Sequence, residues 1–349
     1  MVTQQGEGES LRRVLVIGGN RFMGYQLVWR LLAAGDDVTV LNRGSRPDPF
    51  GSRVNRIVVD RTTDAFRDAL NGHAYDAAID FACFNAEDAQ GAVNCLDGQV
   101  GHYVFISSGS VYMVLKGVER PVREPLPEGA YDGEPLGEPT DPEDIPSWRY
   151  GMGKREAEDV FLAAWQERHF PVTRLRLPIV NGERDPERRL ESYIYRILDG
   201  GPVLLPDGGS HTVRHVYAAA VVRALTAILG RADTLGEAYN LSQDERPTLV
   251  EFIRLLSEVL GAPARPVAVS DDTLRAAGLS ARSISPFSGR WSSCLDAHRA
   301  RAVWGFQHEP LDEYLGRIVA AFFACPPHEP PEDYATRHTE RQVAARLGL

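Results

Sequence analysis

The residues with the clearest chemical potential are Tyr150 and Lys154, which stand four positions apart. On a helix this spacing places both side chains on one face, and Ser147 is a candidate N-cap just before them. A phenol is a poor acid or base near neutral pH, but a neighbouring ammonium lowers the pKa of a phenol because it stabilises the phenolate. The pair is therefore suited to exchange a proton with a substrate hydroxyl, although a Tyr-x-x-x-Lys pattern also arises by chance.

Lysine is rare in this chain, which makes its presence at position 154 informative. Of 38 basic residues, only Lys116 and Lys154 are lysine. A compact ammonium can reach ribose hydroxyls where a guanidinium fork fits poorly. The lysine at 154 is therefore expected to have a task that arginine cannot perform.

Three serines, Ser107, Ser108 and Ser110, follow the apolar segment 103–106, which has the pattern of a buried strand. In a doubly wound sheet, ligands bind beyond the carboxyl ends of the strands. A serine in that place can hydrogen-bond the substrate oxygen that the tyrosine protonates or deprotonates. A serine-rich turn without a ligand is the alternative for any one of the three.

A glycine-rich turn lies between the first strand, 14–17, and a helix that starts near Phe22. Its sequence is Gly18-Gly19-Asn20-Arg21-Phe22-Met23-Gly24. Glycines let the backbone approach a pyrophosphate, and the free N–H groups at the helix start bind its charge. The turn indicates a dinucleotide site, and a ligand-free turn is the alternative. Arg21 stands where the middle glycine of a Gly-x-x-Gly-x-x-Gly pattern would be, which alters the usual close backbone contact.

Charges after the second and third strands bear on the choice of dinucleotide. No Asp or Glu follows the second strand, 38–41, to accept from ribose hydroxyls; Arg43, with Arg46, could instead pair with a 2′-phosphate. This favours NADP(H), with NAD as the other possibility and a solvated loop arginine as the alternative for Arg43. Asp60 at the end of the third strand could accept from the adenine amine or cap the strand.

Apolar segments alternate with helical patterns through the first half of the chain. Strands are expected at 14–17, 38–41, 56–59, 77–82, 103–106 and 172–177. Helices are expected between them, for example at 63–70 and 86–96. Strands that are apolar on both faces and alternate with helices predict an α/β fold, a doubly wound parallel sheet covered by helices.

The second half is mainly helical and predicts a smaller substrate-binding region. Helical patterns cover 187–198, 218–229, 249–260, 296–304 and 311–323. We expect the dinucleotide-binding domain at 1–180, with 216–242 returning to it, and the substrate-binding region at 181–215 and 243–325. The tail, 326–349, is expected to be loosely held.

Residues 113–148 interrupt this organisation. They hold seven prolines and nine acidic residues and show no periodicity. We expect a long insertion rather than a packed element, either a lid or a disordered segment.

Composition excludes several classes of protein. The net charge of −10 argues against general binding to nucleic acid or to an anionic membrane. No apolar run approaches the ~20 residues that span a bilayer, and Met1 to Leu11 contains no signal-peptide core. The four cysteines are scattered, which excludes a zinc ribbon and a disulfide scaffold and fits a reducing cytoplasm. We predict no metal site.

The motifs together resemble the short-chain dehydrogenase/reductase superfamily in its extended and atypical branch, the NAD(P)-dependent epimerase/dehydratase family, with its Rossmann fold. The resemblance covers roughly residues 12–323 and also rests on the segments 105–112, 176–182, 239–242 and 295–306. The forms of the glycine turn and of Asp60-Arg61 resemble an atypical subgroup that includes chloroplast stem-loop-binding proteins.

The resemblance implies Ser108, Tyr150 and Lys154 as the catalytic trio. Its implied cofactor-binding residues are Gly18, Asn20, Arg21, Phe22, Met23, Gly24, Asn42, Arg43, Asp60, Arg61, Phe81, Ala82, Ser107, Tyr150, Lys154, Pro178 and Ile179. Its implied substrate-binding residues are Ser108, Ser110, Asn181, His211 and Arg214.

Departures from the family pattern limit the choice of reaction. A 4,6-dehydratase carries an Asp-Glu pair after the catalytic Ser or Thr, but Gly109-Ser110 stands there, which disfavours that reaction. Nucleotide-sugar enzymes often have Asn at the position of Ile179 and an Arg for the pyrophosphate near His211. Arg214, Arg188 or Arg189 could substitute, so a nucleotide sugar, another sugar, a cyclitol or another polyol all remain open.

The favoured function is an NADP(H)-dependent, sugar-modifying enzyme that transfers hydride at a secondary alcohol or ketone, with epimerisation as the net reaction. A ketoreductase or dehydrogenase on a sugar-like or polyol substrate is the alternative. A non-catalytic NADP(H) sensor or RNA-binding protein is a different class, but it needs no Tyr150–Lys154 pair, and RNA binding favours a basic stripe. A homodimer through the helices 86–96 and 155–168 is expected, although their apolar residues could equally belong to the core.

Overall fold

The computed structural model describes residues 11–348. Met1 to Ser10, most of the segment without a signal-peptide core, lies outside these residues. In the part of the chain that the structure describes, no helix is both long and apolar enough to cross a membrane.

Within residues 11–348, seven strands form one sheet in the order β10-β6-β5-β4-β1-β2-β3. Their bounds are β1 Arg13–Ile17, β2 Asp37–Asn42, β3 Asn55–Val58, β4 Ala77–Asp80, β5 Tyr103–Ser108, β6 Val172–Leu177 and β10 Ala238–Asn240. The pairs β1–β2, β1–β4, β2–β3 and β4–β5 are parallel. The predicted doubly wound α/β fold is confirmed, and each of the six strands expected in the first half is present within two residues of its expected bounds.

The chain divides into two compact units. Unit 1 comprises the residues up to Ile106, Glu156–Arg174 and Leu225–Glu237, and unit 2 comprises Ser107–Arg155, Leu175–Ala224 and the residues from Ala238 onward. The boundary therefore runs through strand β5 and through the helix α5, Ile145–Arg168. The sequence placed its domain boundaries elsewhere, at 180, 215 and 242.

Unit 1 buries the strands β1, β2 and β4 between helices. Its helices are α1 Phe22–Ala33, α2 Ala65–Leu70, α3 Ala86–Leu96 and the second half of α5. Leu15 and Ile17 of β1 pack with residues of α2, α3 and α5, whereas Val16 lies against Val28 of α1 beside Gly19. Because side chains alternate along a strand, β1 is apolar on both faces and is covered by helices on both.

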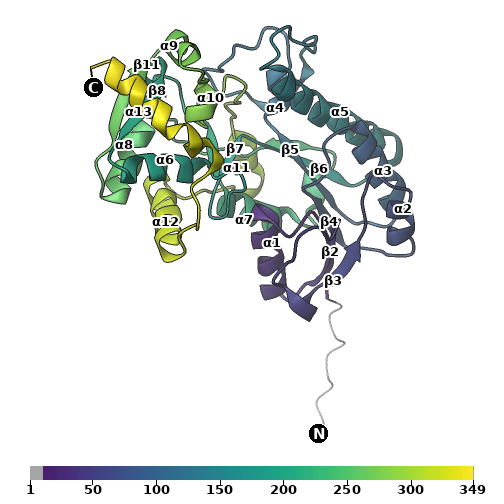
Figure 1. Cartoon of the computed structure of the whole chain (residues 1–349). Coiled ribbons are helices and arrows are strands. Elements are labelled where there is room, and N and C mark those ends of the chain that lie inside the picture. Colours follow the sequence, from purple (N-terminus) through teal and green to yellow (C-terminus); the bar gives the residue numbers. More distant parts are fainter. Residues whose placement is uncertain (1–10, 349) are drawn as a thin grey trace. The chain divides into compact units, whose positions relative to one another are not determined.

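Unit 2 contains two further parallel ladders, which the sequence did not predict. β7 (Ile179–Asn181) pairs with β9 (His215–Tyr217), and β8 (Pro202–Pro206) pairs with β11 (Arg265–Val269). Its helices are α4 Ser110–Met113, α6 Arg189–Leu198, α7 Ala218–Ile228 (which continues into unit 1), α8 Leu249–Leu260, α9 Asp271–Ala276, α10 Ala281–Ile284, α11 His298–Trp304, α12 Leu311–Ala324 and α13 Arg337–Arg346. Helices α6 and α13 pack against β8, and α8 packs against α6 and α12 (Figure 1).

The acidic insertion is more ordered than the sequence indicated. It contains a short 3₁₀ helix, η2 (Glu128–Asp132), and its last residues form the start of α5. The ring of Tyr131 is buried between the guanidinium groups of Arg155 and Arg176, 4.0 and 4.3 Å from their carbon atoms. The Tyr131 hydroxyl donates to the Arg155 carbonyl, and Arg155 donates back to the Tyr131 carbonyl at 2.9 Å. The prediction of an unpacked segment is wrong. Cation–π contacts and hydrogen bonds to the backbone hold the insertion in place, and such contacts leave no periodic pattern in the sequence.

The tail is also packed. Helix α13 lies against β8, with Val343, Ala344 and Glu340 buried. The Glu340 carboxylate accepts from Arg196 at 2.7 Å and from Arg337 at 2.9 Å. The expectation of a loosely held tail is therefore wrong, because its charged residues find buried partners of opposite charge.

Candidate functional site

The glycine-rich turn of unit 1 has the backbone geometry that a pyrophosphate site needs. Gly18 has φ +84°, which favours glycine, and its N–H donates to the Leu41 carbonyl at 2.9 Å. A Cβ on Gly24 would lie 2.9 Å from the Gly18 carbonyl oxygen, so a side chain there would separate the helix from the turn. The first hydrogen bond of the helix is donated by Tyr25 to the Arg21 carbonyl, and the N–H groups of Phe22, Met23 and Gly24 precede it.

The turn is only partly exposed, because Gly18 is half-buried and Gly19 and Gly24 are buried. Arg21 is exposed and extended at φ −136°, and its side chain makes no capping bond to the helix. Asn20 donates to the Arg46 carbonyl at 3.3 Å. Phe22 has φ +45°, a strained value for a non-glycine residue, and such strain often marks a functional turn. The turn therefore fits the phosphates of a dinucleotide, with Arg21 free to face them.

Arg43 and Asp60 lie where the sequence placed them, after β2 and near the end of β3. The Asn42 side chain accepts from the Gly44 N–H at 2.8 Å and so shapes the turn from which Arg43 extends, exposed. Asp60 accepts from the N–H and hydroxyl of Thr62 at 3.0 and 2.9 Å. These bonds, with a weaker contribution from the Arg43 charge, lower the pKa of Asp60. Asp60 therefore serves as a local cap and stays charged beside Arg43.

Arg61 has an internal position rather than an exposed one. Its side chain is 9% exposed, and its Nη1 donates to both oxygens of the fully buried Asp80 at 2.8 and 3.0 Å. Asp80 also accepts from the Ala82 N–H at 2.7 Å and from the Tyr103 hydroxyl at 2.5 Å. The sequence analysis missed Asp80, although an Asp that ends the apolar strand Ala77–Asp80 was a visible signal.

Phe81 and Ala82 follow directly after β4 and are half-buried. The Phe81 N–H donates to the Ile17 carbonyl at 3.0 Å. A Cβ on Gly18 would lie 3.4 Å from the Phe81 Cβ and 3.5 Å from the Ala82 Cβ. These two residues therefore pack against the start of the glycine turn.

In unit 2, Tyr150 and Lys154 lie on α5 as predicted, but in different environments. Tyr150 is 43% exposed, whereas Lys154 is 2% exposed. Gly151, between them, packs backbone to backbone on α4: a Cβ there would lie 2.7 Å from the Ser110 carbonyl oxygen. Ser147 is not the N-cap, because α5 begins two residues earlier, at Ile145.

The three candidate serines differ in burial and contacts. Ser107 is buried, while Ser108 and Ser110 are half-buried. The Ser108 hydroxyl donates to the Ser110 hydroxyl at 3.1 Å and accepts from the Ser110 N–H at 3.2 Å. Ser108 and Ser110 therefore present adjacent hydroxyls next to the helix that carries Tyr150.

Gly109 reveals a neighbour that the sequence analysis missed. Its φ of −61° suits any residue, so the requirement for glycine is spatial. A Cβ there would lie 1.9 Å from the Ser293 hydroxyl oxygen. No sequence signal connects positions 109 and 293, and the contact shows that any side chain at position 109 would require Ser293 to move.

The remaining predicted residues of unit 2 are mostly buried. Pro178, between β6 and β7, and Ile179, the first residue of β7, are half-buried. Asn181 is buried and donates to the Tyr314 hydroxyl at 3.4 Å. Arg188 and Arg189 pair with Glu191 and Asp185, so their charges are compensated internally.

Arg214 is a buried cation beside the Cys294 thiol, and no salt bridge joins it to a carboxylate within residues 11–348. It is 5% exposed and donates to the Val122 carbonyl of the insertion. Burial lowers the pKa values of both Arg214 and His211, and the Arg214 charge lowers that of His211 further. Among residues 11–348, the Arg214 Nε and the His211 Nε2 have no hydrogen-bond partner. An anionic or acceptor group placed beside these two atoms would therefore satisfy a buried donor and a buried charge.

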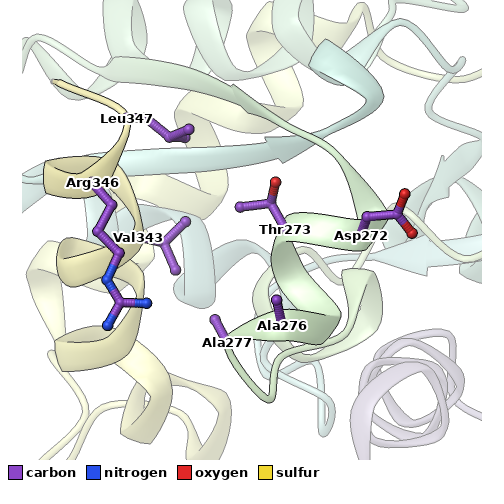
Figure 2. Close-up of a pocket in the computed structure, with 7 residues that line it drawn as sticks. All are labelled: Asp272, Thr273, Ala276, Ala277, Val343, Arg346 and Leu347. Atoms are coloured by element: carbon purple, nitrogen blue, oxygen red, sulfur yellow. The ribbon is translucent and has the colours of Figure 1, made fainter.

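A pocket of about 330 Å³ opens elsewhere in unit 2. Figure 2 shows the residues that line it. On one side are Ala276 and Ala277, at the end of α9. On the other side are Val343, Arg346 and Leu347, at the end of α13. None of the residues predicted for the site lines it. In the described part of the chain, no cluster of three or more His, Cys, Asp or Glu residues could hold a metal ion.

Comparison with known proteins assigns the family. The model of the NAD dependent epimerase/dehydratase family matches residues 14–242, more than half of the chain. The chain belongs to this family. The predicted resemblance is confirmed, and the protein is an enzyme of the NAD-dependent epimerase/dehydratase type.

Two curated relatives match most of the chain at low identity. A 2′-dehydrokanamycin reductase of Streptomyces kanamyceticus is 27% identical over 75% of this chain and 70% of its own length. The chloroplast stem-loop binding protein of 41 kDa b of Arabidopsis thaliana is 24% identical over 73% of this chain. The match spans 65% of that protein, less than two thirds of its length.

Solved structures of this family share the fold. UDP-glucose 4-epimerase of Thermotoga maritima superposes with a TM-score of 0.70 at 20% identity, over 89% of this chain and 99% of that one. UDP-glucuronic acid 4-epimerase of Bacillus cereus, in complex with UDP-glucuronic acid and NAD, gives 0.68 at 17% identity over the same shares. At these identities the likeness shows the fold alone.

Proposed function

We propose that this enzyme transfers hydride at a secondary alcohol or ketone of a sugar-like substrate, with epimerisation as its net reaction and NADP(H) as its cofactor. The observation that carries the proposal is the packing of Gly151 on Ser110. It brings the helix of Tyr150 and Lys154 into backbone contact with the segment that presents the hydroxyls of Ser108 and Ser110.

The residues fit a nicotinamide dinucleotide. The N–H groups of Phe22, Met23 and Gly24 precede the first hydrogen bond of the helix, and a Cβ at Gly24 would clash with the backbone of Gly18 and Gly19. When bound, the nicotinamide accepts hydride from the substrate carbon or returns it. In this proposal the Tyr150 phenol exchanges the hydroxyl proton, Lys154 stabilises the phenolate and holds the ribose, and Ser108 hydrogen-bonds the substrate oxygen.

The preference for the 2′-phosphate rests on Arg43. This guanidinium is exposed. Its neighbour Asp60 already accepts hydrogen bonds from the N–H and the hydroxyl of Thr62. We expect Arg43→Gln to weaken NADPH binding about tenfold, because a charge-assisted contact is lost, and to leave NADH binding unchanged. Fluorescence titration with both nucleotides measures this, and equal weakening of both would contradict the role of Arg43.

The substrate is proposed to carry an anionic or strongly accepting group for Arg214 and His211. A buried guanidinium without a carboxylate is costly, and a ligand oxygen would compensate it. The phosphates of a nucleotide sugar would serve, as would another acidic group on a sugar or cyclitol. Arg214→Met should raise KM for such a substrate while leaving NADPH affinity unchanged.

The experiment that tests the net reaction is to unfold the purified protein and identify any nucleotide that it releases. An epimerase returns the hydride to its substrate in each turnover, so near-stoichiometric retained NADP⁺ supports epimerisation. Retained NAD⁺ alone would overturn the NADP preference. A protein that is purified without bound nucleotide and binds neither NADP(H) nor NAD(H), even at millimolar concentration, would overturn the proposed function.

A ketoreductase is the second candidate, because the 27% identical relative is named a reductase. A reductase releases oxidised cofactor after each turnover. An empty protein that binds NADPH reversibly, and oxidises it stoichiometrically with a keto-sugar, would favour this candidate over the epimerase.

A further inference from the structure

We propose that Arg61, Asp80 and Tyr103 form a buried platform that positions the cofactor half-site of unit 1, and that Arg61 acts through this platform rather than by contact with the cofactor. The inference rests on the proposed function, because it concerns how the proposed nicotinamide dinucleotide is bound. It gives three buried polar residues a role as positioning residues.

The platform is held by charge-assisted hydrogen bonds inside unit 1. The Asp80 carboxylate accepts from Arg61 Nη1 at 2.8 and 3.0 Å and from the Tyr103 hydroxyl at 2.5 Å. Asp80 and Tyr103 are fully buried. Burial opposes the charge of Arg61, but the attraction of Asp80 outweighs it and holds the pKa of Arg61 above its usual range. Such a pair has fixed geometry and is costly to break.

The platform fixes the segment after β4. The fourth bond to Asp80 comes from the Ala82 N–H at 2.7 Å, which anchors Phe81 and Ala82. Their Cβ atoms stand 3.4 and 3.5 Å from the place where a Cβ of Gly18 would be. Movement of Ala82 would therefore change the packing at the first glycine of the proposed pyrophosphate turn.

The same arginine fixes two other segments. Arg61 Nη2 donates to the Asp88 carbonyl at 2.7 Å, and its Nε lies 3.2 Å from the Asp88 carboxylate, near the start of α3. Along the chain, Arg61 directly follows Asp60, the proposed adenine acceptor beyond β3. One buried guanidinium thus links the ends of β3 and β4 to the start of α3.

The test compares nucleotide affinity with stability in four forms of the full chain: wild type, Arg61→Lys, Tyr103→Phe and Val93→Ala. Each is titrated with NADPH and with NADH, and each is melted. We expect Arg61→Lys to raise both Kd values about tenfold, because an ammonium cannot bridge two partners as the fork does. The ratio of the two Kd values should stay at the wild-type value.

Tyr103→Phe removes only one hydroxyl and covers the case in which Arg61→Lys does not fold. It should raise both Kd values about threefold, since one hydrogen bond to the shared carboxylate is lost. Val93, fully buried in the same core, is the control. Val93→Ala should lower the melting temperature without changing either Kd, which separates positioning from loss of stability.

Three outcomes would overturn the platform. Wild-type Kd values in Tyr103→Phe and in any folded Arg61→Lys protein would show that the network does not reach the site. Loss of NADPH affinity alone in Arg61→Lys would show direct contact with the 2′-phosphate. Failure of the wild type to bind either nucleotide would refute the proposed function and, with it, this inference.

Discussion

At the scale of single residues, Tyr150 and Lys154 differ in burial in the way that the proposed proton exchange requires. Tyr150 is accessible to a substrate, and Lys154 is enclosed. A buried ammonium acts on a neighbouring phenol through less solvent screening than an exposed one does. The sequence supplied the identities and the spacing of this pair, and the fold supplied the difference in burial.

Tyr150→Phe should lower kcat/KM about a thousandfold, because general acid–base catalysis of this kind contributes 10²–10⁴-fold. NADPH affinity should stay within about twofold of wild type, since only the hydroxyl is lost. The measurements are steady-state turnover of any sugar that the wild type accepts and a fluorescence titration. Tyr195→Phe, on α6, is the matched control and should keep full activity. Normal turnover by Tyr150→Phe would show that another group moves the proton.

At the scale of elements, α5 depends on a glycine at its closest approach to α4. A Cβ at Gly151 would lie 2.7 Å from both the Ser110 carbonyl oxygen and the Val114 side chain. The carbonyl belongs to the backbone and cannot move alone. The helix would have to shift away from Ser108 and Ser110 and carry Tyr150 with it.

Gly151→Ala should therefore lower the free energy of unfolding by about 1–3 kcal/mol, the usual cost of overpacking, and should lower turnover. Gly316→Ala in α12 is the control, because a Cβ there meets nothing within 4 Å. The control should gain about 0.5–1 kcal/mol from the better helix propensity of alanine. Urea unfolding and an activity assay check both variants; a neutral Gly151→Ala would show that α5 is not fixed at this point.

Helix α13 is held to α6 by charges rather than by a wide apolar face. Glu340 is fully buried and accepts from Arg196 and Arg337, while Arg337 also donates to Asp199 at 2.6 Å. Removing the carboxylate would leave two buried arginines with less compensation. Glu340 therefore joins the C-terminal helix to α6 from inside the core, and Asp199 adds a second acidic partner.

Glu340→Gln should destabilise unit 2 by about 3–5 kcal/mol, the cost of breaking a buried ion pair by removing one partner. Glu332→Gln, an exposed neighbour in the 3₁₀ helix η5 (Glu332–Thr336), should change stability by less than about 0.5 kcal/mol. Urea unfolding measures both, and limited proteolysis should cut near α13 first in Glu340→Gln. Equal stability of the two variants would show that the buried ion pairs of Glu340 do not hold the tail in place.

At the scale of the whole molecule, buried neutral histidines couple stability to pH. His102 is buried in unit 1, its Nδ1 accepts from the Gly230 N–H at 3.0 Å, and its Nε2 lies 2.8 Å from the Thr173 hydroxyl. Burial lowers the pKa of His102 to about 4 and, in unit 2, that of His215 to about 3. Both values lie below the ordinary value of 6.5 that we expect in the unfolded chain.

Because the unfolded chain binds these protons first, stability is full above about pH 6.5 and is lost as the pH falls through 6.5 towards 4. Each histidine should remove about 2 kcal/mol between pH 7.5 and pH 5. His102→Gln should unfold with a pH dependence smaller by about that amount, measured by urea titration at both pH values. An unchanged pH dependence would show that His102 stays neutral for another reason, or titrates outside this window.

The sequence by itself determined the sheet, the glycine turn and the spacing of the proposed catalytic pair. β-branched runs such as Val14–Ile17, buried on both faces, are periodic signals, and Tyr150 and Lys154 are neighbours on one helix through local spacing. Local geometry and local periodicity need no knowledge of distant residues. For that reason the six early strands, the helices between them and the spacing of the pair could be read directly.

Only the tertiary structure decided the contacts between residues far apart in sequence. Arg61 was expected at the cofactor, but Asp80, nineteen positions later, receives its guanidinium. Ser293 occupies the space beside Gly109, and Glu340 orders a tail that composition suggested was loose. Aperiodic segments and charged side chains carry no signal of their partners, because the partner is chosen by distance in space and by exclusion of water. These long-range contacts determine where the predicted motifs are positioned in the folded chain.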